Sequence, residues 1–124
     1  ARLYWYTVES GLIEEQGRLR LLGAGIASSL SESIFALEDP PPNRLGFDLE
    51  RIMRTPYRID DFQQVYFVVP SLRTLLDATL QDFGGLYARL AGADDLAIDA
   101  ILPADHVVTR GTQAYAAQRA LAGR

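Results

Sequence analysis

The sequence YWYTVESGL at residues 4–12, followed by GAGIASSLSE at residues 23–32, organises the rest of this chain. It places one carboxylate, Glu9, on a predicted helix whose neighbouring residues are mostly aromatic or aliphatic. Trp5 and Glu9 are four residues apart, so an α-helix puts both on one face. A charge in such surroundings is costly unless it is paired, hydrogen-bonded or bound to a metal. The residues alone leave open whether Glu9 meets an arginine, the backbone or a metal ion.

The composition is that of one ordinary globular domain. The chain has 124 residues, of which 48% are hydrophobic and 23% are charged. Its net charge of −4 argues against nucleic acid or an anionic membrane as a partner. The absence of cysteine excludes a disulfide framework and a thiolate metal site, and it favours a cytoplasmic location. No apolar run approaches the roughly 20 residues of a membrane-spanning helix.

The N-terminal part is predicted to contain a helix and a hairpin. Residues 1–11 are interpreted as the last turns of a buried helix that stops at Gly11. Residues 12–22 are predicted to form a hairpin in which Gly17 supplies the positive φ of a tight turn. The following Gly23-Ala24-Gly25 is interpreted as flexible or closely packed backbone.

The next segments are punctuated by caps and prolines. Ser29-Leu30-Ser31-Glu32 is a capping-box pattern, which predicts a helix that runs to about Leu37. Three consecutive prolines make residues 38–46 a predicted loop. Asp48 is predicted to cap a short helix that runs through Arg54.

The second half is predicted to begin with strands and continue as a long helix. Residues 57–59 and 65–69 are rich in aromatic and β-branched residues, so they are predicted strands joined by a turn that contains Asp60 and Asp61. The longest helix is expected from Ser71 to about residue 90, kinked or interrupted at Gly84-Gly85. The scattered arginines are interpreted as solvent-exposed; they are Arg18, Arg20, Arg51, Arg54 and Arg73.

The residues from Ala91 onward differ in character from the body. Residues 96–102 are predicted to form a short edge strand, and residues 112–122 an alanine-rich helix that ends at Gly123. The expected organisation is therefore a body of residues 1–90 and a tail of residues 91–124.

Several residues in combination carry a family resemblance: Ala1, Tyr4 to Glu9, Gly11, Leu12, Gly23 to Gly25, Ser28, Ser29 and Glu32. The pattern resembles the iron- and tetrahydrobiopterin-dependent aromatic amino acid hydroxylases, most closely the bacterial phenylalanine 4-hydroxylases. The likeness continues through residues 57–68 and fades after about Leu90. It implies an α+β fold, mostly helical with small β-hairpins, that forms the C-terminal part of the hydroxylase catalytic domain.

The resemblance also implies roles for individual residues. Glu9 corresponds to the carboxylate ligand of Fe(II), in a site that the family completes with two histidines. Ser28 corresponds to a residue that hydrogen-bonds to a ligand histidine and lies near the substrate. Ala1 and Tyr4 correspond to positions that contact the pterin. The remaining positions of the implied substrate site are Trp5, Ser10, Gly25 and Glu32.

Each of these roles has a structural alternative. Trp5 is equally a candidate for core packing, and Tyr57 is more often expected there than in a pocket, since aromatic residues in helices and strands usually pack in the core. Ser28 and Glu32 also fit a helix N-terminus without further function. Ser10 departs from the family, which usually has an aromatic residue directly after the carboxylate ligand. This departure makes an aromatic amino acid a firmer expectation for the substrate than phenylalanine itself.

The implied activity is the hydroxylation of L-phenylalanine to L-tyrosine with dioxygen, tetrahydrobiopterin and non-haem Fe(II). The chain starts inside an apolar helical pattern without an initiator Met, which suggests a cut point within a longer protein. Its one histidine, His106, lies in the tail and is interpreted as solvated. We therefore expect the chain alone to be inactive, because both cofactors need the upstream segment that carries the histidines.

Two kinds of partner follow from this reading. One is the missing N-terminal segment, and the other is a second copy that associates through an exposed apolar face of Leu3, Trp5 and Tyr6. The alternative function is a non-catalytic, stand-alone binding or interaction module derived from the same fold.

Overall fold

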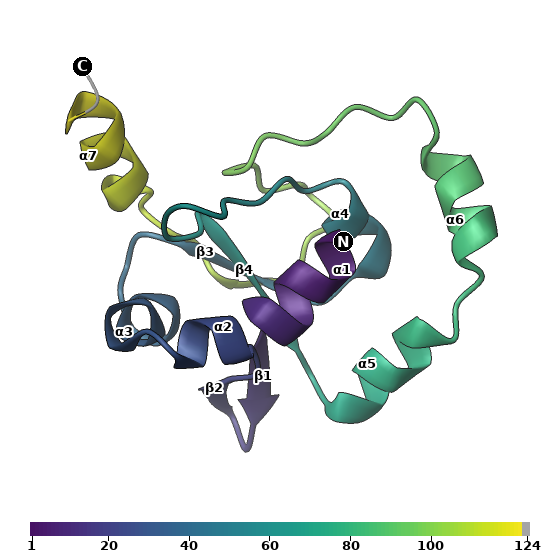
Figure 1. Cartoon of the computed structure of the whole chain (residues 1–124), viewed down its shortest axis with the longest axis horizontal. Helices are drawn as coiled ribbons and strands as arrows, with labels where there is room; N and C mark the ends of the chain where they lie inside the picture. The colour runs from purple at the N-terminus through teal and green to yellow at the C-terminus, as the bar shows by residue number, and fades with distance from the viewer. Residues whose placement is uncertain (123–124) are drawn as a thin grey trace.

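Figure 1 shows the computed structural model, which describes residues 1–122. Strands β1 to β5 form one mixed sheet in the order β2-β1-β4-β3-β5. The elements are α1 (Arg2–Tyr4), the π-helix η1 (Trp5–Glu9), β1 (Leu12–Glu15), β2 (Arg18–Leu21), α2 (Ala24–Ala27), α3 (Leu30–Leu37), β3 (Asn43–Gly46), α4 (Leu49–Met53), β4 (Val65–Val69), α5 (Leu72–Thr79), α6 (Phe83–Leu90), β5 (Val107–Thr109) and α7 (Ala114–Ala122).

The central strand β4 divides the core into two layers. Its five residues are all buried, and successive side chains of a strand point to opposite faces. Tyr66 and Val68 pack with residues of β1, α2 and α3. Val65 and Phe67 pack on the other face with residues of η1, β3 and α4. The sheet is therefore covered on both faces by helices that are far apart in the sequence (Figure 1).

The strand pairing confirms the α+β class and assembles the small β elements into one sheet. β1 and β2 form the predicted hairpin, with Gln16 at φ 52° and Gly17 at φ 77° in its turn. Two positive φ values in a two-residue loop match the right-handed twist of the flanking strands. β4 runs parallel to both β1 and β3, and β5 closes the edge antiparallel to β3.

Two predictions about strands are wrong. Residues 43–46 belong to β3, a mostly buried inner strand, although residues 38–46 were predicted to be a loop. Conversely, residues 57–59 form no strand. The Asn43 to Gly46 segment is too short to show a period, so pairing with β4 decides its conformation.

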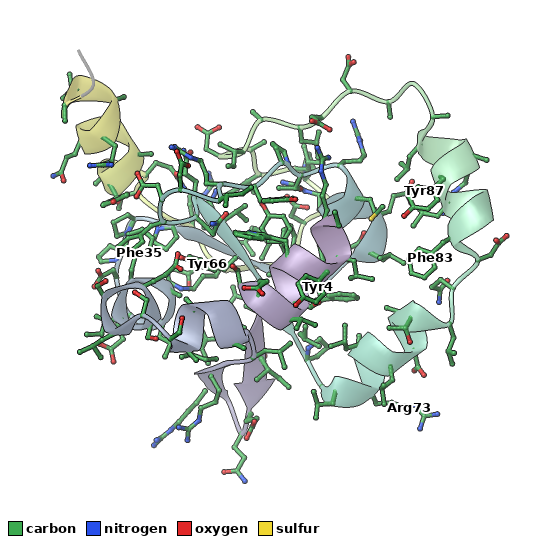
Figure 2. All side chains as sticks on the ribbon, in the orientation of Figure 1. Tyr4, Phe35, Tyr66, Arg73, Phe83 and Tyr87 are labelled. Atoms are coloured by element: carbon green, nitrogen blue, oxygen red, sulfur yellow. The ribbon has the colours of Figure 1, made fainter. Side chains whose placement is uncertain are left out.

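The helix predicted from Ser71 to about residue 90 is interrupted, which is one of the two expected alternatives, but the interruption does not lie at Gly84-Gly85. The break lies at residues 80–82, where Asp82 caps α6 by accepting a hydrogen bond of 3.1 Å from the amide of Gly85. Gly84 and Gly85 therefore lie inside the first turn of α6 and do not interrupt it. Figure 1 shows α5 and α6 as an arm beside the sheet, and Figure 2 shows Arg73 projecting from α5 into solvent.

The tail packs on the body through hydrogen bonds and through strand β5. Residues 96–102 form no strand, contrary to the prediction, and the edge strand is β5. The amide of Leu96 donates to the carbonyl of Arg54 at 2.8 Å. The predicted alanine-rich helix is confirmed as α7, and its predicted end at Gly123 lies outside the described residues.

Arg51 corrects the interpretation of the arginines as solvent-exposed. Its guanidinium is buried and pairs with Asp105 at 3.0 Å. It also donates to the hydroxyl of Thr55 at 2.6 Å and to the carbonyl of Ala100 at 2.9 Å. The cation thus joins α4 to the tail segment that precedes β5.

The apolar face expected to drive self-association is not exposed as predicted. Tyr6 is fully buried, and Leu3 and Trp5 are only partly exposed. The exposed large residues of this helix are Tyr4 and Val8. Within residues 1–122, no helix is long and apolar enough to cross a membrane.

Candidate functional site

The N-terminal helix widens into a π-helix where it carries Glu9. The amide of Ser10 donates to the carbonyl of Trp5 at 2.7 Å, a bond that spans five residues instead of four. This wider turn places residues five apart above one another. The Tyr4 hydroxyl consequently lies 3.4 Å from Oε1 of Glu9, at the long end of hydrogen-bonding distance. The α-helical spacing that pairs Trp5 with Glu9 is therefore not the geometry that this segment adopts.

The Glu9 carboxylate rests against the backbone of α2. A Cβ atom added to Gly25 would lie 2.2 Å from Oε2 of Glu9 and 2.9 Å from its carbonyl oxygen. A Cβ atom added to Gly23 would lie 2.3 Å from the same carbonyl oxygen. Both glycines therefore permit a contact that any side chain would prevent. Of the two interpretations of Gly23-Ala24-Gly25, close packing is the one that the structure adopts.

Glu9 has no cationic partner among the described residues. The ion pairs found within residues 1–122 all involve carboxylates other than Glu9. Within the same residues, the Glu9 side chain accepts a hydrogen bond from the Tyr4 hydroxyl. The arginine or backbone partner that the sequence left open is thus not observed there. A partly exposed carboxylate without a cation retains its oxygen lone pairs for a further ligand.

Trp5 and Tyr57 form the aromatic part of the site. Their rings stack with centroids 4.6 Å apart and an interplanar angle of 15°. Both rings pack against the core cluster that contains Tyr6 and Phe67. Trp5 is nevertheless only partly buried, and its indole Nε1 is buried without a hydrogen-bond acceptor among the described residues. Core packing and a role at a pocket wall are both compatible with this placement.

The other predicted positions near Glu9 differ in exposure. Ser10 is buried, with 4% of its surface exposed, whereas Ala1 and Tyr4 lie at the surface. The Ser28 hydroxyl donates to the carbonyl of Gly25 at 2.8 Å. Ser28 is thereby linked to the α2 turn that supports Glu9, while Ser29 caps α3 by accepting from the amide of Glu32 at 3.3 Å. The capping alternative therefore applies to Ser29, whereas the Ser28 hydroxyl bonds to the turn of α2.

Glu32 lies in the first turn of α3 and contacts the central strand. It accepts a hydrogen bond of 3.2 Å from the hydroxyl of Tyr66. Burial raises the pKa of Glu32, while this hydrogen bond and the backbone of Gln63 act in the opposite direction. Burial is also the main cause of the raised pKa of Tyr66, to which the charge of Glu32 adds. Tyr66 therefore remains a protonated donor beside the carboxylate.

Sequence reasoning did not identify Tyr66 as a site residue. The signal for it is present, because residues 65–69 (VYFVV) are otherwise wholly apolar. A tyrosine hydroxyl in a buried strand needs a hydrogen-bond acceptor. Which acceptor it meets depends on the packing of α3 against β4.

The described residues do not bring together a complete set of metal ligands. Within residues 1–122 there is no group of three or more histidine, cysteine, aspartate or glutamate side chains that could hold an ion. His106 packs beside Gly46 of β3, whereas Glu9 ends η1 and its carboxylate lies against Gly25 of α2. His106 is therefore placed away from Glu9, and its exposure agrees with the predicted solvated side chain.

A groove of about 470 Å³ runs between α4 and the helices α5 and α6, and residues such as Glu50, Asp77 and Leu86 line it. It contains none of the predicted site residues.

Comparison with known proteins gives consistent matches. Residues 1–89 match the family model of the biopterin-dependent aromatic amino acid hydroxylases. A phenylalanine-4-hydroxylase of Caulobacter vibrioides is 66% identical over 116 residues, which are 94% of this chain and 40% of the relative. The chain therefore spans about two fifths of the length of that relative.

Solved structures from Chromobacterium violaceum match the fold as well. The iron- and phenylalanine-bound phenylalanine hydroxylase has a TM-score of 0.83 and 55% identity, over 86% of this chain and 40% of that chain. The structure with iron(III) and the oxidised cofactor 7,8-dihydrobiopterin has a TM-score of 0.81 and 54% identity, over 86% of this chain and 38% of that chain.

Proposed function

Because the chain belongs to the biopterin-dependent aromatic amino acid hydroxylases, we propose that it is the part of a phenylalanine 4-monooxygenase that carries the carboxylate iron ligand. The proposed reaction converts L-phenylalanine to L-tyrosine with dioxygen, tetrahydrobiopterin and non-haem Fe(II). The Caulobacter vibrioides relative is a phenylalanine-4-hydroxylase, and the matching Chromobacterium violaceum phenylalanine hydroxylase has been solved with bound iron, phenylalanine or dihydrobiopterin. The cytoplasmic location remains a prediction.

The observation that carries the proposal is the surroundings of the Glu9 carboxylate. It is a carboxylate with no cation beside it in the described residues, pressed against a glycine that leaves room for its oxygen atoms. A hard oxygen ligand of this kind suits Fe(II) when imidazole ligands complete the site. Since residues 1–122 hold no complete ligand set, we propose that the histidine ligands come from residues outside this sequence. On this proposal the chain alone does not hydroxylate phenylalanine.

The chain's own residues would then position the reactants. Glu9 would hold the iron, which supplies oxygen activation when it is bound, and the hydroxyl of Tyr4 would orient Oε1 of Glu9. Ala1 and Tyr4 are the proposed pterin contacts at the exposed end of the helix. The Trp5 ring, held by its stack on Tyr57, would form a flat apolar wall for an aromatic side chain.

The remaining proposed roles concern the amino acid substrate. Gly25 keeps α2 close to Glu9, and Ser28 is the proposed partner of a ligand histidine. Glu32 is proposed to orient an arginine that binds the substrate carboxylate. In the family, an aromatic residue usually follows the carboxylate ligand, and Ser10 supplies no ring at that position. The pocket is therefore proposed to accept larger aromatic side chains as well as phenylalanine.

The test compares the full-length protein with its Glu9→Gln variant, with Glu14→Gln as the control. Glu14 is an exposed carboxylate of β1. We expect Glu9→Gln to lose bound Fe(II) and the conversion of phenylalanine to tyrosine, while Glu14→Gln keeps both. Retention of iron by Glu9→Gln would remove Glu9 as a ligand. A wild-type protein that binds no iron and hydroxylates no aromatic amino acid would favour the non-catalytic binding module.

A further inference from the structure

Tyr66 and Glu32 form a buried contact between the central strand and α3. Tyr66 is fully buried in β4, and its hydroxyl donates to Oε2 of Glu32 at 3.2 Å. Since β4 is hydrogen-bonded to a neighbouring strand on each side, the position of Tyr66 is set by the sheet. Glu32 thus contacts a donor that lies on the central, fully buried strand of the sheet.

The helix that carries Glu32 is fixed at both ends. Ser29 caps its N-terminus, and the buried guanidinium of Arg44 donates to the carbonyls of Ala36 at 2.6 Å and Phe35 at 3.0 Å near its C-terminus. A cation at the C-terminal carbonyls of a helix also complements the helix dipole. With the backbone of α3 held, the remaining freedom of Glu32 lies in its side-chain torsions, which the Tyr66 hydroxyl restrains.

An aromatic layer supports the same contact from the C-terminal helix. Phe35, Phe62 and Tyr115 of α7 form a cluster in which each ring contacts the other two. The ring centroids lie 4.7 Å apart for Phe35 and Phe62, 5.2 Å for Phe35 and Tyr115, and 5.1 Å for Phe62 and Tyr115. It also meets Tyr66 edge-on at 6.4 Å, and Figure 2 shows the Phe35 and Tyr66 rings side by side next to α3. Tyr115 is held in turn by Asp61, which accepts its hydroxyl at 2.6 Å. The Phe35 ring that meets Tyr66 is therefore itself held by two further rings.

We infer that Tyr66 is a positioning residue that holds Glu32 in the conformation used to bind the amino acid substrate. This inference deepens the proposed function and rests on the assignment of Glu32 to the substrate site. The aromatic layer of Phe35, Phe62 and Tyr115 maintains the position of the Tyr66 ring. The role is indirect, because Tyr66 acts through Glu32 and not on the substrate.

The electrostatics of Glu32 agree with this role. Burial opposes its ionisation, and so does the nearby negative charge of Asp61. The groups that favour the ionised form are the Tyr66 hydroxyl and the backbone of Gln63. Removing the Tyr66 hydroxyl takes away one of the two groups that favour the ionised form of the half-buried Glu32, so the pKa of Glu32 should rise further. A carboxylate that must be charged to orient a cation would then work only at higher pH.

The test uses Tyr66→Phe, which removes the hydroxyl and keeps the ring. The first measurement is the carboxyl ¹³C titration of Glu32 by NMR, in which we expect the pKa to rise. Tyr6→Phe is the matched control, because Tyr6 is an equally buried tyrosine whose hydroxyl bonds to the carbonyl of Pro56 instead. A merely structural loss would move the Glu32 titration equally in both variants.

The second measurement is steady-state hydroxylation by the full-length protein. Tyr66→Phe should raise KM for the amino acid about tenfold, since a hydrogen bond to a charged group is lost, with a smaller change in kcat. In a Glu32→Gln background the same substitution should add little, which a double-mutant cycle detects. Additive effects of the two substitutions on KM would overturn the inference.

The outcomes separate the inference from the proposed function. If Glu32→Gln raises KM and Tyr66→Phe leaves both KM and the Glu32 titration unchanged, the inference is wrong and the function stands. If Glu32→Gln leaves KM unchanged in an active enzyme, the assignment of Glu32 is wrong, and the inference falls with it. If the wild-type protein hydroxylates no aromatic amino acid, the proposed function itself fails.

Discussion

At the scale of single residues, the contact between Glu9 and Gly25 governs the candidate site. Oε2 of Glu9 lies only 2.2 Å from the position that a Cβ atom of residue 25 would occupy, which is closer than real Cβ atoms approach other atoms. Helix propensity alone would favour alanine over glycine in α2 by up to about 1 kcal/mol. The glycine is thus explained by the position of the Glu9 carboxylate.

Gly25→Ala should therefore impair metal binding more than folding. The new methyl group must displace the Glu9 side chain, because Oε2 of Glu9 is the nearest atom to it, and the carbonyl oxygen of Glu9 at 2.9 Å limits any other movement. We expect the full-length variant to bind Fe(II) at least about tenfold more weakly, an effect typical of disturbed ligand support. The measurement is a metal-binding titration combined with urea unfolding.

Gly84→Ala serves as the control for this substitution. Gly84 lies in α6, and its added Cβ atom would meet only Asp82 Oδ1, at an ordinary distance of 3.4 Å. This variant should gain up to about 1 kcal/mol of stability and keep its iron affinity. Equal iron affinity in the two alanine variants would contradict the role assigned to Gly25.

At the scale of secondary-structure elements, α7 is attached by the aromatic contacts of Tyr115 and by hydrogen bonds to one carboxylate. Asp61 accepts the hydroxyl of Tyr115 at 2.6 Å, the guanidinium of Arg119 at 2.9 Å and the amide of Phe62 at 2.8 Å. Burial would raise the pKa of Asp61, but the hydrogen bonds from Tyr115, Phe62 and Arg119 outweigh it and hold the pKa below its usual value. The acidic turn predicted from Asp60 and Asp61 is thus also the anchor of a distant helix.

The attachment of α7 should accordingly weaken in acid. A carboxylate with a depressed pKa contributes stability above its unfolded pKa of about 3.9, and that contribution disappears as the pH falls through the folded value. We expect Asp61→Asn to lower the free energy of unfolding by about 1–3 kcal/mol near neutral pH. The difference from wild type should shrink toward zero in acid, as measured by urea unfolding across the acidic range.

Two further variants show how much of the stability lost in Asp61→Asn comes from Arg119 and how much from Tyr115. Arg119 is 59% exposed, so its ion pair is largely screened and Arg119→Ala should cost less than about 1 kcal/mol. Tyr115→Phe should reproduce most of the Asp61→Asn effect. A stability difference between wild type and Asp61→Asn that does not depend on pH would show that Asp61 does not anchor α7 through its charge.

At the scale of the whole molecule, long-range pairs join segments that the chain order separates. Arg51 and Asp105 are 54 positions apart, yet both side chains are more than nine-tenths buried and lie 3.0 Å apart. The same guanidinium bonds to the carbonyl of Ala100, and Asp105 accepts from the amide of Leu102 at 2.7 Å. This pair fixes the path of the tail before it enters the sheet as β5.

Arg51→Met should therefore destabilise the entire fold. Removing one member of a buried ion pair leaves the other without a counter-charge, which typically costs about 3–5 kcal/mol. Arg73→Met is the control, because the Arg73–Asp77 pair is 83% and 59% exposed and should contribute less than about 1 kcal/mol. Both values follow from chemical unfolding monitored by circular dichroism.

The double variant Arg51→Met/Asp105→Leu gives an internal check. Replacing both charges by apolar side chains removes the unpaired Asp105, so part of the lost stability should return. If Arg51→Met were no more destabilising than Arg73→Met, the buried pair would not be the link that holds the tail.

The local sequence by itself determined the elements whose signals lie within a few residues. Gly17 specifies the tight turn of the β1–β2 hairpin, and Ser29 and Asp48 specify helix starts, because turn and cap chemistry act over one to four positions. The combination of motifs around Glu9 was also sufficient to identify the family, as the family match over residues 1–89 confirms.

The tertiary structure decided what depends on partners far along the chain. Residues 43–46 became an inner strand because β4 and β5 pair with them, and residues 57–59 did not become a strand. Arg51 was buried by the tail, and Tyr66 met Glu32 only when α3 packed on the sheet. The wider π-helical turn brought Tyr4, and not Trp5, to Glu9. Such contacts follow from burial and pairing between distant segments, which local propensity does not encode.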